Sequence, residues 1–231
     1  MQSILITGAS RGIGAATALA LAKPGTRLTL AARNRSALET VAAQVTATGA
    51  ECIVAPCDVT DPVQVSETVA IAAGAGRLDV VVHSVGGALV APLEALSLAE
   101  WEAHLRTQLT SLFLVAQMAV ARMDRGGLLI NIASVAARQA FPGWSAYVAA
   151  KHGALGFAAA IREELRPRGI RVCSILPAAT NTAIWDAIPG EWARDNMLQP
   201  ADVAAAIAAV VALPPYVTVE DLTIGHVVGR L

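Results

Sequence analysis

The feature that most constrains the fold is a regular alternation of short β-branched segments with longer, Ala-rich helical segments. Strands as continuously apolar as LDVVVHS and GLLINIAS are typical of strands that are covered on both faces. Their strict alternation with helices predicts a doubly wound parallel β-sheet of about seven strands, flanked by helices on both sides. We expect strands near residues 3–7, 27–32, 51–55, 78–84, 128–133, 170–175 and 217–224, and helices near residues 12–22, 35–48, 62–73, 98–123, 146–166 and 200–213.

Composition narrows the class of protein further. Hydrophobic residues make up 55% of the chain, the formal net charge is −1, and no run of like charges suggests a nucleic-acid partner. The longest apolar stretch, residues 203–213, is shorter than the roughly 18 residues that a membrane span needs. Cys52, Cys57 and Cys173 form no metal-binding pattern, and their odd number suits a reducing compartment. We therefore expect a cytoplasmic protein without a metal site or a membrane contact.

One segment, residues 178–199, has no clear hydrophobic period. It contains Trp185, Ile188, Trp192 and Met197. Loops of this length in a compact domain are often lids or binding loops. We expect a substrate loop here, within a single domain of residues 1–231, with a surface excursion as the alternative.

A glycine-rich turn follows the first predicted strand, in the sequence TGASRGIG of residues 7–14. Gly8 permits a tight turn, Gly12 lets the backbone approach a pyrophosphate, and Gly14 allows close helix–strand packing. The helix that follows would present free N–H groups and a partial positive charge to the anion. The turn predicts a dinucleotide site that includes Ser10, Arg11 and Ile13, although an ordinary turn has the same local pattern.

The second strand ends without the carboxylate that commonly binds the ribose of NAD(H). Arg33 instead follows the strand, and Arg11 lies in the glycine turn. The forked donors of two guanidinium groups match the 2′-phosphate of NADP(H). We therefore predict NADP(H) as the cofactor; the alternative is that Arg33 and Arg35 are solvated residues at a helix start.

Two aspartates follow the third strand. The carboxylate of Asp58 is suited either to accept a hydrogen bond from the adenine amino group or to close a turn, and the sequence favours neither. Asp61 precedes Pro62, a common opening of a helix, so we expect Asp61 to cap the helix that follows.

A candidate catalytic group combines Ser134, Tyr147 and Lys151. Ser134 ends a buried strand, and Tyr147 and Lys151 are four residues apart on one face of a helix. A ketone that accepts a hydride must also receive a proton, and a phenol with a pKa of about 10 is a weak acid. We expect Lys151 and the positive nicotinamide to lower the pKa of Tyr147, and Ser134 to bind the substrate oxygen. A bare Tyr-x-x-x-Lys pattern also occurs as a surface pair.

Together these motifs resemble the short-chain dehydrogenase/reductase family, in its compact single-domain branch, over essentially the whole chain. The similar segments are TGASRGIG at residues 7–14, Asp58-Val59, NIAS ending at Ser134, YVAAK at residues 147–151, and Pro177 with Thr182. The resemblance implies a Rossmann fold and an oxidoreductase that interconverts a ketone or aldehyde and an alcohol. It also implies a homodimer or homotetramer built on the helices near residues 98–123 and 146–166.

The resemblance also implies roles for these residues. Tyr147 would be the general acid/base, Lys151 would hold the nicotinamide ribose, and Ser134 would orient the carbonyl. Asp58 and Val59 would flank the adenine, and Pro177 and Thr182 would border the nicotinamide. Gly86 would also bind the cofactor.

The sequence departs from the family pattern at three places. The family's NNAG is His83-Ser84-Val85-Gly86 here, and we expect His83 to be a core histidine satisfied by backbone groups. The family's fourth catalytic residue, an Asn seven positions after a Trp, falls on Gln108, counted from Trp101. Gln108 keeps the amide, so we expect a water-linked relay to Lys151, shifted by one methylene. Ala178 replaces a glycine, and the end at residues 224–229 lacks the usual glycine pair.

The candidate substrate pocket is mostly aromatic. Its residues are Arg138, Phe141 and Trp144 between Ser134 and Tyr147, and Ile184, Trp185, Trp192 and Met197 in the long loop. This set suits a medium-sized hydrophobic ketone or aldehyde. Arg138 either clamps a carboxylate or faces solvent.

Two other functions share part of this pattern. A cofactor-binding regulatory protein with weakened catalysis would account for Gln108 and the HSVG segment, but the complete Ser134, Tyr147 and Lys151 argue against it. A sugar-nucleotide epimerase or dehydratase can share the Tyr-x-x-x-Lys pattern, but such relatives resemble longer chains with a different glycine spacing.

Overall fold

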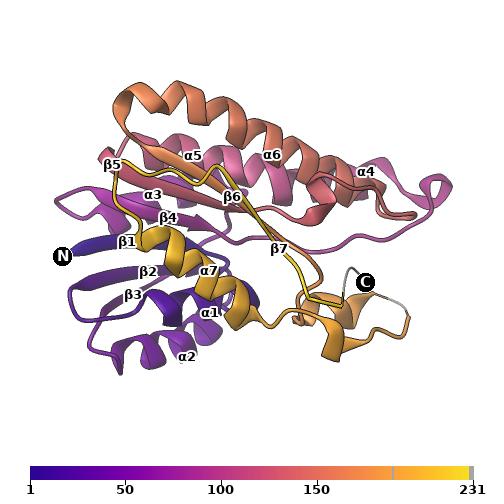
Figure 1. Ribbon diagram of the computed structural model, residues 1–231, viewed down its shortest axis with the longest axis horizontal. Coiled ribbons are helices and arrows are strands. Elements are labelled where there is room, and N and C mark those ends of the chain that lie inside the picture. The colour runs from indigo at the N-terminus through magenta and orange to yellow at the C-terminus, as the bar shows by residue number, and fades with distance from the viewer. Residues whose placement is uncertain (189, 229–231) are drawn as a thin grey trace.

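The sheet of the computed structural model, which describes residues 1–188 and 190–228, contains seven strands among those residues, all paired in parallel (Figure 1). Their order is β3-β2-β1-β4-β5-β6-β7, which confirms the predicted doubly wound sheet. The strands are β1 (Gln2–Thr7), β2 (Thr26–Ala32), β3 (Glu51–Pro56), β4 (Leu78–His83), β5 (Met123–Ile132), β6 (Arg171–Pro177) and β7 (Asp221–Ile224).

Helices cover both faces of the sheet. On one face lie α1 (Gly12–Leu21), α2 (Arg35–Thr46) and α7 (Pro200–Ala212), and on the other α3 (Pro62–Ala73), α5 (Ser111–Val120) and α6 (Ser145–Leu165), while α4 (Leu98–Leu105) precedes α5 (Figure 1). Neighbouring strand residues serve opposite cores: Ile4 and Ile6 belong to the first, and Leu5 to the second. This two-sided burial explains why the strands are apolar at nearly every position. Among the described residues, no helix is both long and apolar enough to cross a bilayer.

The single helix expected over residues 98–123 is wrong in two respects. A π-helix at Arg106–Thr110 separates α4 from α5, and β5 already begins at Met123. A π-turn holds one more residue than an α-helical turn. The segment is apolar on either side of the insertion, so its pattern does not reveal the change of register.

The last strand is also shorter than expected, because pairing with β6 begins at Asp221 rather than at residue 217. The N–H of Val217 donates instead to the carbonyl oxygen of Pro214, at 2.9 Å, and closes a turn. The chain end that includes Gly229 lies outside the described residues.

The topology brings the candidate site together. Because all seven strands are parallel, their carboxyl ends share one edge, and the chain crosses over in opposite directions from β1 and from β4. Ligands of open α/β sheets bind at such a switch point. Residues 178–188 and 190–199 project beyond this edge (Figure 1). The base of this segment is closed by the Leu198 N–H, which donates to the Ala179 carbonyl oxygen at 3.0 Å.

Candidate active site

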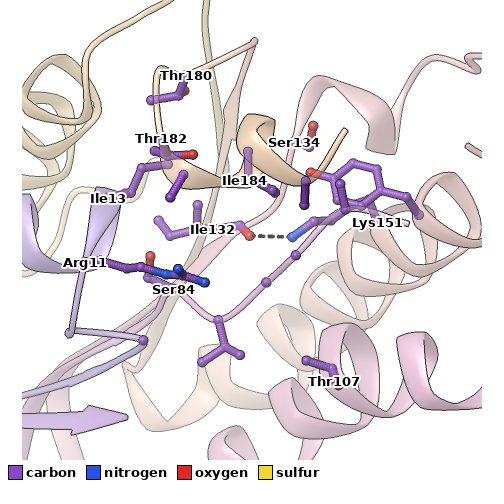
Figure 2. A pocket seen from close by; sticks show the side chains of 18 of the residues that line it. Arg11, Ile13, Ser84, Thr107, Ile132, Ser134, Lys151, Thr180, Thr182 and Ile184 are labelled. Atoms are coloured by element: carbon purple, nitrogen blue, oxygen red, sulfur yellow. Dashed lines mark hydrogen bonds between the residues drawn. The ribbon is translucent and has the colours of Figure 1, made fainter. Parts of the chain in front are cut away.

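A cavity of about 1050 Å³ opens at the carboxyl ends of the strands. The predicted site residues that line it are Gly8, Ser10, Arg11, Ile13, Arg33, Asp58, Val59, Gly86, Ser134, Phe141, Trp144, Tyr147, Lys151, Pro177, Thr182, Ile184, Trp185 and Trp192. Five others lie outside its lining: Gly12, Gly14, Gln108, Arg138 and Met197, the last of which is buried in the core. Figure 2 shows Arg11, Ser134 and Lys151 around the same pocket.

The glycine turn is shaped by close backbone approaches. Gly8 has φ +71°, and a Cβ there would lie 2.2 Å from the Ser84 carbonyl oxygen. A Cβ on Gly14 would lie 2.2 Å from the carbonyl oxygen of Gly8. Within the described chain no side chain caps the start of α1, so the first N–H groups of the helix remain available to an anion.

Residues that follow β2 and β3, among them Arg33 and Asp58, line another part of the cavity. Asp58 Oδ1 accepts hydrogen bonds from the N–H and the hydroxyl of Thr60, at 2.9 and 2.8 Å, which lower the pKa of Asp58. The nearby Arg33 guanidinium adds to this lowering. Asp58 therefore closes a turn while its carboxylate also borders the cavity. Asp61 caps α3 as expected, by accepting from the N–H groups of Val63 and Gln64.

Ser134, Tyr147 and Lys151 converge where β5 meets α6. Ser134 follows β5, and its Oγ accepts from the Ala136 N–H at 3.1 Å. Lys151 is only 5% exposed, and its Nζ donates to the Ile132 carbonyl oxygen at 3.0 Å (Figure 2). The same Nζ lies 5.6 Å from the centre of the Tyr147 ring.

Burial dominates the ionisation of this group. It raises the pKa of Tyr147, against a smaller lowering by the hydrogen bond with Ser134, and it lowers the pKa of Lys151 to about 8. The lowering of the Tyr147 pKa by Lys151 together with a positive nicotinamide stays a prediction.

Gln108 is buried in the π-helix and contacts the loop after β4. Its Nε2 donates to the Gly87 carbonyl oxygen, while its Oε1 has no partner among the described residues. A Cβ on Gly86 would lie 3.0 Å from that Oε1. The amide thus fixes the Gly86–Gly87 segment beside the cavity and makes no direct bond to Lys151.

His83 is buried as expected, but hydroxyl groups rather than backbone groups satisfy it. Its Nδ1 lies 2.9 Å from Thr7 Oγ1, and its Nε2 lies 3.1 Å from Ser111 Oγ. Ser111 donates its own proton to the Thr107 carbonyl oxygen, so it accepts from Nε2–H, and Nδ1 accepts from Thr7. Burial, with a smaller effect of Lys151, lowers the pKa of His83 to about 3, which keeps the ring neutral.

Arg138 was expected in the substrate pocket, but it lies outside the cavity. Its Nη2 lies 2.6 Å from Asp221 Oδ2, and Arg138 does not border the cavity. The neighbouring β7 supplies this carboxylate, which the sequence separates from Arg138 by 83 positions. Arg138 therefore neither clamps a substrate carboxylate nor simply faces solvent.

Several lining residues were not singled out from the sequence. Arg106 and Thr107 enter the cavity from the π-helix, and Thr60 enters from the turn after β3. The sequence could have pointed to two of these residues, because they neighbour predicted site residues. Thr60 lies two positions after Asp58, and Thr107 precedes Gln108. Arg106 borders the cavity because of the π-helix, which the hydrophobic pattern of the sequence does not reveal.

A doubly wound sheet with a glycine turn and a Ser/Tyr/Lys group at one crevice defines a nicotinamide-dependent oxidoreductase. The chain belongs to the short-chain dehydrogenase family, whose model matches residues 2–191.

Three relatives illustrate the range of the family. The chain is 38% identical over 194 residues to D-threitol dehydrogenase of Mycolicibacterium smegmatis, covering 81% of this chain and 75% of that protein. It is 34% identical over 195 residues to 3-oxoacyl-[acyl-carrier-protein] reductase of Synechocystis, covering 82% and 78%. An alcohol dehydrogenase of Thermococcus sibiricus, solved with 5-hydroxy-NADP, superimposes with a TM-score of 0.92 at 30% identity, covering 100% and 99%.

Proposed function

We propose that the protein is an NADP(H)-dependent carbonyl reductase that interconverts a ketone or aldehyde and an alcohol. The observation that carries the proposal is that one cavity contains both the glycine turn with two arginines and the Ser134, Tyr147 and Lys151 group. The complex of the Thermococcus sibiricus relative with 5-hydroxy-NADP supports the choice of cofactor.

The residues present fit a dinucleotide. The close approach at Gly8 and the uncapped start of α1 form a cradle for phosphate, and Arg11 and Arg33 border the same space. In this proposal Asp58 and Val59 hold the adenine, and Gly86, Pro177 and Thr182 hold the nicotinamide. When bound, the cofactor supplies or accepts the hydride.

The chain supplies the proton and orients the substrate. Tyr147 donates its phenolic proton to the carbonyl oxygen during reduction, while the Ser134 hydroxyl donates a hydrogen bond to the same oxygen. Lys151, held by the Ile132 carbonyl oxygen, positions the cofactor ribose and returns a proton to Tyr147. Residues 178–199 form the substrate loop over this site.

The proposal is tested by following NADPH absorbance with a panel of ketones and aldehydes and, in reverse, NADP⁺ with their alcohols. We expect turnover of at least one carbonyl compound. NADPH binding without turnover of any compound would favour the non-catalytic regulatory alternative.

The cofactor preference gives a direct test of the arginines. We expect NADPH to bind at least about tenfold more tightly than NADH, equivalent to about 1.4 kcal/mol. Arg33→Asp should invert this preference, because a carboxylate repels the 2′-phosphate and accepts from a ribose hydroxyl. Isothermal titration with both cofactors measures the ratio.

Arg35→Asp is the matched control for this experiment. Arg35 lies one turn from Glu39 on the exposed face of α2, with 3.6 Å between Nη1 and Oε1, and does not border the cavity. Its substitution should leave the ratio unchanged. Equal affinities for both cofactors in the parent protein would refute the assignment to NADP(H).

Gln108 is proposed as a positioning residue of the proton relay. Gln108→Leu removes the donor to Gly87 and the only polar group of this side chain, so we expect a several-fold lower kcat and a rate profile displaced to higher pH. Gln108→Asn keeps the amide and should retain most of the activity. The measurement is kcat against pH for the three proteins; superimposable profiles would mean that the amide is purely structural.

The proposal extends to a cytoplasmic homodimer or homotetramer. Phe113 on α5 is 42% exposed and meets Phe157 on α6 edge to face, with ring centres 6.1 Å apart. These two helices are the ones that the family resemblance assigns to subunit contacts.

A further inference from the structure

Aromatic rings gather at the end of the cavity that contains Tyr147. The Trp144 ring centre lies 5.4 Å from that of Tyr147, with the rings edge to face, and 6.2 Å from that of Trp185. Trp192 continues the series at 4.7 Å from Trp185, and Phe141 lies 6.4 Å from Trp144. Phe, Trp and Tyr make up only 4% of the chain, so this concentration is not a product of composition. We call Phe141, Trp144, Trp185 and Trp192 the aromatic wall.

The indole N–H groups of the two wall tryptophans in the loop, Trp185 and Trp192, bind to the protein itself. Trp185 Nε1 donates to the Thr180 carbonyl oxygen at 3.0 Å, and Trp192 Nε1 donates to the Ile188 carbonyl oxygen at 3.2 Å. Both indole N–H groups therefore donate to backbone carbonyl oxygens of the loop. What these two residues offer to a substrate is ring surface.

The other residues beside the wall are also mainly apolar: Pro142, Ala183, Ile184 and Ala187. A substrate with several hydroxyl groups would lose water here and gain few partners beyond Ser134 and Tyr147. An aromatic ring would instead meet partners of its own kind, because aromatic pairs favour edge-to-face or offset contacts at centre distances of about 4.5–7 Å.

The loop holds its part of the wall in place. Arg194 donates to Asn181 Oδ1 at 3.1 Å, to the Thr182 carbonyl oxygen at 3.2 Å and to Asp186 Oδ1 at 2.6 Å. This one guanidinium thus ties together the two ends of the turn that carries Trp185. A wall ordered before binding loses less conformational entropy when a ring enters.

We propose that the site selects aryl ketones and aryl aldehydes, in which the aromatic ring is bonded directly to the reacting carbonyl carbon. This proposal rests on the proposed carbonyl reductase function and specifies its substrate class. The geometry favours direct attachment, because Trp144 and Tyr147 both line the cavity with ring centres 5.4 Å apart. With the carbonyl oxygen at the Tyr147 hydroxyl, a ring bonded to the carbonyl carbon would then be within reach of Trp144.

The test compares acetophenone with cyclohexyl methyl ketone, which has the same carbonyl and a saturated ring of the same carbon number. We expect kcat/KM for acetophenone to exceed that for the saturated ketone by at least about fivefold, since aromatic contacts add to simple burial. In Trp144→Leu and in Trp185→Leu the ratio should fall toward one. Trp101→Phe, which changes a tryptophan outside the cavity, should keep the parent ratio.

Binding provides a readout besides turnover. The affinity of each ketone is measured by isothermal titration in the presence of NADP⁺, and NADP⁺ affinity in each variant reports whether the site is intact. We expect acetophenone to bind more tightly than the saturated ketone in the parent, and Trp144→Leu to remove the difference while NADP⁺ affinity persists.

The outcomes separate the two proposals. Turnover of aliphatic or saturated ketones with no advantage for acetophenone would overturn the aryl selectivity and leave the carbonyl reductase function standing. Selective, Trp144-dependent binding of acetophenone without turnover of any carbonyl compound would overturn the reductase function and support an aryl-binding site. Equal binding of both ketones, with or without turnover, would overturn the inference.

Discussion

Tyr147→Phe is expected to lower kcat for carbonyl reduction by at least about 100-fold, the usual scale of acid–base assistance, while the protein remains folded and binds NADPH. The substitution removes only the hydroxyl. The ring contacts with Trp144 at 5.4 Å and His104 at 6.0 Å persist, so packing around α6 should be unchanged.

The direction of the pH dependence follows from the raised pKa of Tyr147. Reduction needs the protonated phenol, so its rate should fall as pH rises through the pKa of Tyr147. Oxidation of the alcohol needs the phenolate and should show the opposite trend.

The chain offers a matched control, because its only other tyrosine, Tyr216, is 87% exposed. Tyr216→Phe should leave kcat and both pH profiles unchanged. Near-parent turnover in Tyr147→Phe would place the acid on another group and reject the mechanism.

Gly14→Ala is expected to destabilise the protein by about 3 kcal/mol, the upper part of the range for overpacked sites. The added Cβ would lie 2.2 Å from the Gly8 carbonyl oxygen, and a backbone group cannot rotate away as a side chain can. Relief of this clash would move the glycine turn, so NADPH affinity should fall as well. Urea unfolding and cofactor titration measure the two effects.

Gly156→Ala separates this clash from the general effect of a helical glycine. Gly156 lies in α6, and apart from its chain neighbours and the backbone of its own helix nothing among the described residues lies within 4 Å of an added Cβ. Alanine should therefore stabilise the protein by up to about 1 kcal/mol. Similar unfolding free energies for the two variants would show that the α1 start tolerates a side chain.

The parts predicted from sequence depend on local patterns. The strands could be placed because burial on both sides makes them apolar at successive positions, as at Ile4, Leu5 and Ile6. Gly8 and Gly14 stand within one short motif, and the close contact of Gly14 is with the Gly8 carbonyl oxygen of the same turn. Such features need no knowledge of distant segments.

The parts that escaped prediction depend on contacts between distant segments. The partner of Arg138 comes from β7, and the hydroxyl partners of His83 come from β1 and α5. Trp144 and Trp185 meet only because the long loop folds back toward α6. The spacing of residues in the sequence does not predict these contacts.

Because of the π-helix at Arg106–Thr110, the geometry of the site depends on the number of residues in this segment. Each residue turns an α-helix by about 100°, so one extra residue rotates α4 by that angle relative to α5. This rotation leaves Leu112 and Val115 buried while Gln108 directs its amide to Gly87. Deleting one residue would restore a regular helix and turn one half away from its contacts, so a change of length here would disrupt the site even if every side chain that borders the cavity were kept.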